Sequence, residues 1–312
     1  MIRAYVNFAL IKYWGKLDED LRLPYQSSLS FTVDNLYTDT EITILNDAKK
    51  DIVIINGVEN PKESMRVINY LNRLRKELNV SSYVKVISTN NVPMAAGLAS
   101  SASSFASIAT AFVKAFKFDL SQEEISRLAR LGSGSASRSI YGGFVVWEKG
   151  TDKTSVAKKI DVKWDEFRII VCLLDKNEKK ISSTFAMEKS VKNKELYNKF
   201  VVASEKDYNN MLIVLKNKDI NAVGTIAEEN SERMHEIIEA SGIKYKNEES
   251  NYLINLVKKM RSDKIIAYFT MDAGPNVKII TVESEVKKIL SYLSNVETIV
   301  CKQGFDAKEV KH

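Results

Sequence analysis

A stretch of small residues in the first third of the chain has the composition of a loop that binds phosphate. Residues 91–102 read NVPMAAGLASSA, between a strand-like segment and an Ala- and Ser-rich helical segment. Small side chains let an anion approach the backbone, and the free N–H groups at a helix N-terminus attract negative charge. The stretch lacks the G-x-x-x-x-G-K-[ST] pattern of a Walker loop. Taken alone, it is equally typical of an ordinary loop capped by serine.

A second candidate is the segment 132–139, which reads GSGSASRS. Flexible glycines and serine hydroxyls lead to Arg138, and apolar segments on both sides indicate that the arginine is held inside a cleft. A guanidinium donates paired hydrogen bonds to carboxylate or phosphate. A polar turn with a surface arginine would have the same local pattern.

Two further segments place charged groups beside apolar strands. Residues 7–16 read NFALIKYWGK, in which Lys12 and Lys16 flank two aromatic residues. Residues 270–276 read TMDAGPN, so Asp272 stands at a strand end in a tight Gly-Pro turn. Function often resides on such loops. The ordinary alternatives are lysines whose stems pack on apolar surface and an aspartate that bonds only its own backbone.

Strands and helices in both halves of the chain must position these four segments. Strand-like patterns occur at 2–8, 38–45, 51–56, 83–88, 139–148, 167–174, 265–270, 277–282 and 297–301. Helical patterns occur at 62–78, 100–116, 122–130, 284–294 and over most of 184–262. Ser121 and Glu124 predict a capping box, and Asn56-Gly57 predicts a hairpin turn. The mixture predicts an α+β protein with a lobe boundary within 150–180.

Composition narrows the class of protein. The 312 residues are 45% hydrophobic and 28% charged, which is enough for a packed core in one large or two moderate domains. A net charge of +6 suits anionic small substrates, although charge alone does not exclude nucleic acid. Two isolated cysteines and two histidines argue against a disulfide scaffold and a zinc site. The first residues lack a secretory pattern and no apolar run is long enough to span a membrane, so we expect a cytoplasmic protein.

Taken together, the four segments resemble those of the mevalonate diphosphate decarboxylases, within the superfamily of galactokinase, homoserine kinase and mevalonate kinase. The loop from Pro93 to Ala102 is similar to the superfamily's ATP-phosphate loop. More selective for the decarboxylases are ALIKYWGK at 9–16, GSGSASRSIYGG at 132–143 and DAGPN at 272–276. KISST at 180–184 is also similar. The resemblance covers almost the whole chain, in the family's order.

The resemblance implies a two-lobed small-molecule-kinase fold. The N-terminal lobe, residues 1–165, would bind ATP through the nucleotide loop. The C-terminal lobe, residues 166–312, would be ferredoxin-like and would supply part of the substrate cleft.

The resemblance also assigns a role to each matching residue. Asp272 matches the catalytic aspartate that faces the C3 hydroxyl of the substrate, and Lys12 matches an active-site lysine near it. Arg138 matches the arginine that binds the C1 carboxylate, and Ser101 matches the serine that orients the γ-phosphate of ATP. The matches to substrate-binding segments are Tyr13, Trp14, Gly15, Lys16, Ser133, Gly134, Ser135, Ala136, Ser137, Ser183 and Thr184. Of these, Ser183 and Thr184 match the region that meets the diphosphate. The matches to the ATP-binding loop are Pro93, Ala95, Ala96, Gly97, Leu98, Ala99, Ser100 and Ser101.

The activity implied is ATP-dependent decarboxylation of mevalonate 5-diphosphate to isopentenyl diphosphate, ADP, phosphate and CO2, through transient C3 phosphorylation. ATP and Mg²⁺ are the cofactors implied, with the metal ligands unassigned. The resemblance also implies a homodimer, and we expect no nucleic acid or membrane partner. The closest alternative is a sibling enzyme that acts on mevalonate 5-phosphate or mevalonate. A plain kinase should lack ALIKYWGK and DAGPN, and the chain shows no concentrated basic patch for a nucleic-acid-binding module.

The chain departs from the family pattern at several positions. Residues 236–245 lack the Pro-Pro-containing loop of many members, Met94 stands where many have threonine, and Ser137 stands where some have cysteine. Some members place an arginine from the helix at 62–78 near the substrate. Arg66 and Arg73 are both candidates for this role.

Overall fold

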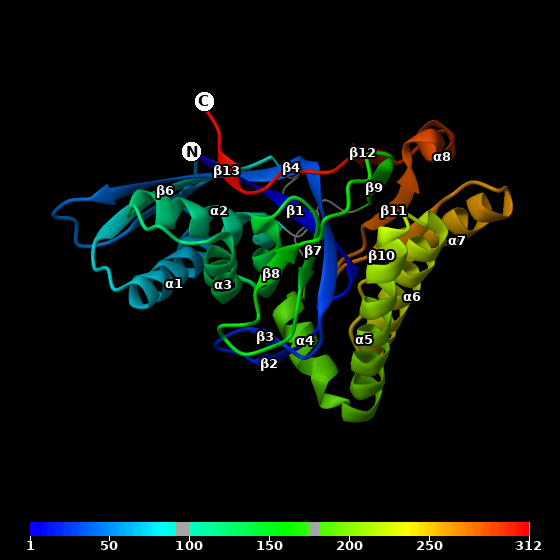
Figure 1. Cartoon of the computed structure of the whole chain (residues 1–312), viewed down its shortest axis with the longest axis horizontal. Helices are drawn as coiled ribbons and strands as arrows, with labels where there is room; N and C mark the ends of the chain where they lie inside the picture. Colours follow the sequence, from blue (N-terminus) through cyan, green and yellow to red (C-terminus); the bar gives the residue numbers. More distant parts are fainter. Residues whose placement is uncertain (92–99, 175–180, 312) are drawn as a thin grey trace.

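The first lobe is built on a seven-stranded sheet in the computed structural model, which describes residues 1–91, 100–174 and 181–311 (Figure 1). The strand order is β13 (Lys308–Glu309), β1 (Ile2–Ile11), β4 (Ser28–Leu45), β6 (Tyr83–Asn90) and β5 (Ile52–Ile55). In addition, β7 (Gly143–Trp147) pairs with β4, and β8 (Ala157–Lys159) pairs with β7. The helices α1 (Pro61–Leu78), α2 (Ser100–Ala115) and α3 (Gln122–Gly132) pack with this sheet, and β2 (Lys16–Asp18) and β3 (Leu23–Pro24) form a separate hairpin.

Strand β1 lies at the junction of the lobes. Its residues are buried except for the half-buried Arg3, because α2 and the second-lobe helix α6 (Ile220–Ala240) both pack against it. A strand covered on both faces has a nearly continuous run of apolar residues, and the β1 sequence IRAYVNFALI is mostly apolar. The chain leaves this strand at Lys12, which places the lysine between the lobes.

The small residues of α2 let the helix approach the sheet closely. The Ser103 and Thr38 hydroxyls lie 2.7 Å apart, and those of Ser107 and Thr40 are also 2.7 Å apart. All four residues are buried, so each hydroxyl requires such a partner. The helix predicted at 100–116 is confirmed to within one residue.

The second lobe has the ferredoxin-like topology that the resemblance implied. Its antiparallel sheet has the order β10 (Tyr268–Met271), β11 (Val277–Val282), β9 (Phe167–Leu173) and β12 (Glu297–Cys301). Helices connect the first strand to the second and the third to the fourth, which gives the βαββαβ pattern. The first connection holds α4 (Ser183–Lys192), α5 (Lys194–Lys216), α6 and α7 (Glu248–Ser262), and the second holds α8 (Val286–Tyr292).

An aromatic cluster joins the two lobes in one core. The ring of Phe31 lies 4.8 Å from that of Phe144 and 4.7 Å from that of Phe167, centroid to centroid. Phe31 and Phe144 come from the first sheet and Phe167 from the second. Beyond β12 the chain returns to the first sheet, where Glu309 pairs with Ile2. The division between residues 165 and 166 stays a prediction.

Several predicted elements need correction. The strand predicted at 139–148 is wrong at its start, because residues Gly134–Ile140 form a 3₁₀ helix and β7 begins at Gly143. The first half of β4 was missed, because its serines and threonines hide the strand pattern. The predicted turn at Asn56-Gly57 forms, with positive φ at both residues and an antiparallel bridge between Ile55 and Val58, but the pairing ends there and the chain continues into α1. The helix predicted at 284–294 is a 3₁₀ turn, Glu283–Glu285, followed by α8.

Candidate active site

Asp272 stands in the turn between β10 and β11, where two buried lysines face its carboxylate. Lys12 Nζ donates to Asp272 Oδ1 at 3.0 Å, and Lys278 Nζ lies 3.1 Å from Oδ2. The contact with Lys278 is an ion pair without hydrogen-bond alignment, so the buried Oδ2 accepts no hydrogen bond from the described residues. An acceptor oxygen therefore remains for the hydroxyl of a ligand.

The two lysines set the charge of this carboxylate. Burial alone would raise the pKa of Asp272, but the positive charges of Lys12 and Lys278 hold that pKa well below its ordinary value. Burial lowers the pKa of Lys12 from 10.5 to about 8, against the opposing effect of Asp272. Asp272 is therefore ionised at neutral pH, and Lys12 loses its proton only slightly above it.

Helix α6 holds the backbones on both sides of this ion pair. Asn230 Oδ1 accepts the backbone N–H of Lys12 at 2.8 Å. The adjacent Ser231 hydroxyl accepts the N–H of Met271 at 2.9 Å and donates to the carbonyl of Met271 at 3.2 Å. Helix α6 therefore bonds to Lys12 of the first lobe and to Met271, which directly precedes Asp272 in the second lobe. These bonds bring the two charged groups together across the lobes.

The turn at residues 272–276 is also anchored from the second lobe. Ser250 Oγ donates to the carbonyl of Pro275 at 2.7 Å, and Asn276 Oδ1 accepts the backbone N–H of Leu174 at 2.7 Å. These bonds fix the conformation of the turn, which its Gly-Pro composition alone would not determine.

Lys278 is a candidate site residue that the sequence reasoning missed. It is only 1% exposed, and its Nζ donates to the carbonyl of Asn276 at 3.2 Å and lies 5.3 Å from the centroid of the Phe8 ring. Its signal was present in the strand VKIITV, where a lysine interrupts apolar residues. A lysine is almost never fully buried without a partner, so its place in such a strand indicated a buried anion.

Arg138 is buried and held by neutral groups. Its Nε donates to Ser30 Oγ at 3.0 Å and to Asn7 Oδ1 at 3.3 Å, and its Nη1 donates to Ser28 Oγ at 2.6 Å. Burial lowers the pKa of Arg138 to about 10, while the negative charge of Asp272 opposes this effect. The guanidinium has no carboxylate partner among the described residues. It is thus a buried cation that can bind an anionic ligand.

Tyr13, in the first predicted substrate-binding segment, contacts the second at Gly134. Its ring packs on Trp147 at 4.7 Å, and a Cβ added at Gly134 would lie 2.7 Å from the same ring, so glycine is required there. The Tyr13 hydroxyl is buried and has no hydrogen-bond partner among the described residues. It can therefore bond to a ligand.

The remaining residues of these segments differ in exposure. Trp14 is buried, with its Nε1 donating to Ser190 Oγ at 3.0 Å, and Gly15 has φ +91° where a Cβ would collide with the Tyr197 hydroxyl. These two residues therefore shape the wall of the site. Ala136 and Ser137 are also buried, whereas Ser133 and Ser135 are half-buried.

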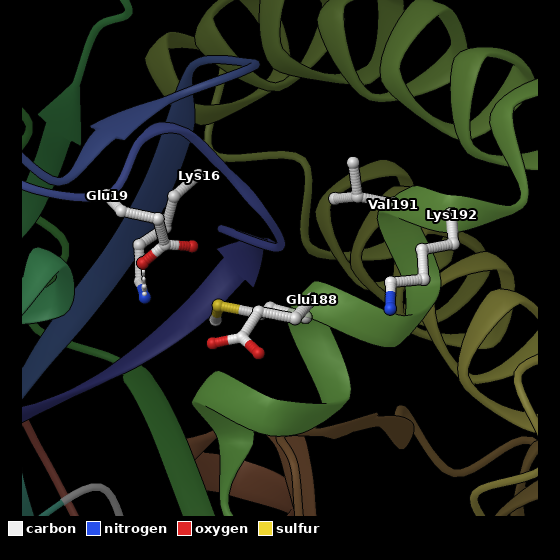
Figure 2. A pocket seen from close by; sticks show the side chains of 6 residues that line it. Lys16, Glu19, Glu188, Val191 and Lys192 are labelled. Carbon is white, nitrogen blue, oxygen red and sulfur yellow. Dashed lines mark hydrogen bonds and ion pairs between the residues drawn. The ribbon is translucent and has the colours of Figure 1, made fainter.

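A pocket of about 330 Å³ opens beside the β2–β3 hairpin (Figure 2). Lys16 and Glu19 form an ion pair on the hairpin side, and Glu188 and Lys192 project from α4 on the other. The remaining lining residues are Met187 and Val191. The predicted Ser183 and Thr184 form the first turn of α4 and are not among the lining residues. Because both signs of charge line this pocket, it is not built for an anion alone.

Most of the predicted ATP-binding loop lies outside the described residues. This applies to Pro93, Ala95, Ala96, Gly97, Leu98 and Ala99. Ser100 and Ser101 form the first turn of α2, as predicted from the sequence. A helix N-terminus that carries hydroxyls is suited to phosphate.

Comparisons with known proteins assign both halves of the chain. Residues 4–157 match the family model described as diphosphomevalonate decarboxylase-like N-terminal domain. Residues 169–310 match the one described as mevalonate 5-diphosphate decarboxylase C-terminal domain. A curated protein of Debaryomyces hansenii, named diphosphomevalonate decarboxylase, is 34% identical over 93% of this chain and 81% of its own length.

Two solved structures extend this likeness to three dimensions. One is described as MDDEF in complex with MVAPP, AMPPCP and magnesium, and it is 38% identical with a TM-score of 0.94 over 98% of this chain and 97% of that chain. The other is mevalonate diphosphate decarboxylase from Staphylococcus aureus, which is 35% identical with a TM-score of 0.95 over 99% of this chain and 97% of that chain.

Proposed function

The chain belongs to the diphosphomevalonate decarboxylase family, and we propose that the site between its lobes catalyses the ATP-dependent decarboxylation of mevalonate 5-diphosphate. The observation that carries the residue assignment is that two buried groups of opposite charge, Asp272 and Arg138, interact electrostatically and can each still bind a ligand. Asp272 Oδ2 offers an acceptor to a hydroxyl, and the buried Arg138 offers a cation to a carboxylate. A β-hydroxy acid carries both of these partners.

The reaction needs the C3 hydroxyl to be phosphorylated first. The hydroxyl oxygen attacks the γ-phosphorus of ATP, the bond to the β-phosphate oxygen breaks, and ADP leaves with its electron pair. Because Lys12 and Lys278 hold the pKa of Asp272 low, the carboxylate is a weak base that mainly orients the hydroxyl by accepting its hydrogen bond. A loose phosphoryl-transfer transition state suits this role, because the hydroxyl becomes strongly acidic only as its oxygen bonds to phosphorus, and its proton then passes to Asp272 and on to solvent.

The second step releases CO2. The bond between C3 and the phosphate oxygen breaks, positive charge develops at C3, and the electrons of the C1–C2 bond form the C2=C3 double bond of isopentenyl diphosphate. Arg138 holds the carboxylate so that its C–C bond aligns with the departing phosphate, which is a positioning role for a two-pronged guanidinium. The ionised Asp272 beside C3 stabilises the developing positive charge.

ATP and Mg²⁺ are the cofactors, as the related complex with AMPPCP and magnesium supports. Among the described residues, no three acidic, histidine or cysteine side chains gather into a metal site. Bound to the ATP phosphates, Mg²⁺ would neutralise part of their charge. We propose that Ser101, at the start of α2, meets the γ-phosphate.

Two further assignments stay proposals. A homodimer would be tested by analytical ultracentrifugation at several protein concentrations. No helix in the described ranges is long and apolar enough to cross a membrane. We propose the cytoplasm as the location, and the free buried thiols Cys172 and Cys301 are compatible with a reducing compartment.

The decisive experiment supplies mevalonate, its 5-phosphate and its 5-diphosphate separately, with ATP and Mg²⁺. ADP release is followed by a coupled assay, CO2 is counted from substrate labelled at C1, and the product is identified by mass spectrometry. We expect stoichiometric ADP, CO2 and isopentenyl diphosphate from the 5-diphosphate. ADP without CO2 would indicate a plain kinase.

A further inference from the structure

His235, on α6, is a buried histidine whose ring nitrogens have no partner. The side chain is only 1% exposed. Neither Nδ1 nor Nε2 forms a hydrogen bond with any of the described residues. A buried polar group without a partner is costly, so such a group in a folded protein calls for an explanation. Its position on α6 supplies one.

The polar residues of α6 that hold the active site lie on one stripe of the helix. Asn230 binds the backbone of Lys12, and Ser231 binds the backbone of Met271. His235 follows Ser231 by four residues, so it lies on the same face of the helix, one turn further along. The stripe therefore continues from the residue before Asp272 to the turn that Asp272 begins.

Apolar contacts hold this part of α6 against the turn. Ala273, which directly follows Asp272, is buried in an apolar cluster with three residues of the helix, namely Met234, Ile237 and Ile238. Two of these residues, Met234 and Ile238, lie within one helical turn of His235. The imidazole is thus placed beside the backbone of the turn from two directions, by the polar stripe and by the apolar cluster.

The surrounding charges keep the imidazole neutral. Burial lowers the pKa of His235 to about 3, and the positive charges of Lys246 and Lys12 act in the same direction. Lys246 itself pairs with Glu239 at 2.9 Å. The backbone and the carboxylate of Asp272 act in the opposite direction, as a hydrogen-bond acceptor and a negative charge near the ring should. A neutral imidazole carries one N–H donor and one acceptor nitrogen.

We propose that His235 is a positioning residue whose neutral imidazole donates a hydrogen bond to the backbone carbonyl of Asp272 when the substrate and ATP are bound. This inference rests on the proposed function, because Asp272 needs accurate placement only against a reacting hydroxyl. The carbonyl already accepts the N–H of Gly274 at 2.8 Å and has a second lone pair. Hydrogen bonds at active sites are often long or misaligned in the free enzyme and tighten in the complex.

A neutral donor suits this place better than a cation. Lys12 and Lys278 already face the carboxylate of Asp272. A protonated histidine would compete with both lysines for that carboxylate. The neutral ring can instead hold the backbone and leave the carboxylate oxygens to the lysines and the substrate.

The test replaces the ring in three ways. His235→Phe keeps the shape and removes both nitrogens, whereas His235→Asn and His235→Gln place an amide N–H near the positions of Nδ1 and Nε2. Met234→Leu is the matched control, because it changes the adjacent buried side chain without changing a polar group. For each variant, kcat and the KM values for the 5-diphosphate and ATP are measured, and thermal unfolding checks the fold. Where the Phe variant does not fold, His235→Leu takes its place.

Loss of the hydrogen bond should lower kcat by about tenfold in His235→Phe. Both KM values should change by less than about threefold, because the bond serves the reacting geometry rather than binding. One of the two amide variants should restore kcat to within about threefold of the wild type, and it would identify the donating nitrogen. The control should match the wild type.

Three outcomes would overturn the assignment while leaving the proposed function intact. Wild-type kcat in a folded His235→Phe variant would show that the ring nitrogens are not needed. A loss of kcat that neither amide restores would leave the ring with a packing role alone. A rise in the KM for the 5-diphosphate at unchanged kcat would mean that His235 binds the substrate directly.

A wild-type protein that releases neither ADP nor CO2 from the 5-diphosphate would instead refute the proposed function. NMR of isotope-labelled histidine then tests the placement of His235 separately. The chain has two histidines, and the spectrum of His235→Phe identifies the signals of His235. These signals should show a neutral ring between about pH 5.5 and 8.5, and they should shift in Asp272→Asn but not in Lys287→Met. Titration within this range, or no shift in Asp272→Asn, would separate His235 from the turn.

Discussion

The site around Asp272, at the reacting end of the substrate, and a second cavity beside α1 handle charge in opposite ways. At the reacting end, Asp272 is enclosed by Lys12 and Lys278, so its charge is paired before any substrate arrives. In the second cavity, of about 230 Å³ beside the β2–β3 hairpin, Arg22, Arg66 and Arg73 are partly exposed and have no carboxylate partner among the described residues. A buried charge without a partner is costly, whereas a partly exposed one is stabilised by water until a ligand replaces that water. The comparison indicates a preset geometry for catalysis and an open one for binding.

The sharpest way to break this comparison is Asp272→Asn. The amide keeps the shape but removes the charge that orients the hydroxyl and stabilises C3, so kcat should fall by about 10³-fold. Binding of ATP, measured by calorimetry, should stay near the wild-type value. Turnover within about threefold of the wild type would show that the assigned role is wrong.

Arg138→Lys tests the carboxylate site at the same end. A point charge cannot replace a guanidinium that bonds Ser28 and Ser30 and still offers N–H groups to a ligand. We expect kcat/KM for the substrate to fall about tenfold or more. Near-wild-type kinetics would contradict this assignment, and Arg168→Lys, at a half-buried arginine on β9, is the control.

Lys278→Met asks whether the second lysine contributes beyond structure. Asp272 would lose one of the two cations that face it, so its pKa should rise and kcat should fall by up to about tenfold. The exposed Lys287→Met serves as the matched control. A change in unfolding temperature without a change in kcat or in its pH profile would leave Lys278 with a purely structural role.

The pH profile separates activity from stability at the reacting end. Because burial lowers the pKa of Lys12 to about 8, kcat/KM should fall above that pH as its proton leaves. Between about 8 and 10.5 the unfolded chain binds more protons at this lysine than the folded protein, so its contribution to stability rises with pH. Activity should therefore fall without loss of the fold, as circular dichroism would check. Lys12→Arg should remove this decline in kcat/KM. If kcat/KM of the variant still falls at the same pH, another group causes the decline.

Ionic strength gives the smallest expected effect. Partly exposed cations are screened by salt, whereas the buried ion pairs of Asp272 are not. Raising KCl from about 0.05 to 0.3 M should increase the KM for the 5-diphosphate about twofold to threefold, with little change in kcat. The Arg22→Gln, Arg73→Gln double variant should lose most of this dependence. An equal dependence in the variant would mean that the screened charges lie elsewhere.

Local patterns predicted much of the fold and the neighbourhood of the site. The capping box at Ser121 and Glu124 formed as expected, because its bonds lie within one helical turn. The segments around Lys12, Arg138 and Asp272 contain residue types that suit anions and proton transfer, so the sequence indicates them as parts of a site. By contrast, the 3₁₀ helix before β7 was missed, because buried contacts of Arg138 override the strand pattern there.

The family, the α+β class and the segments that bear chemistry all follow from the order of the amino acids, because motifs and periodicities are properties of neighbouring residues. Which charges lie together depends on how the chain folds. Lys278 joined the site because β11 brings it beside Asp272, and Arg22 joined Arg66 and Arg73 because the β2–β3 hairpin lies against α1. Such contacts join residues far apart in the chain, and local propensity carries no information about them.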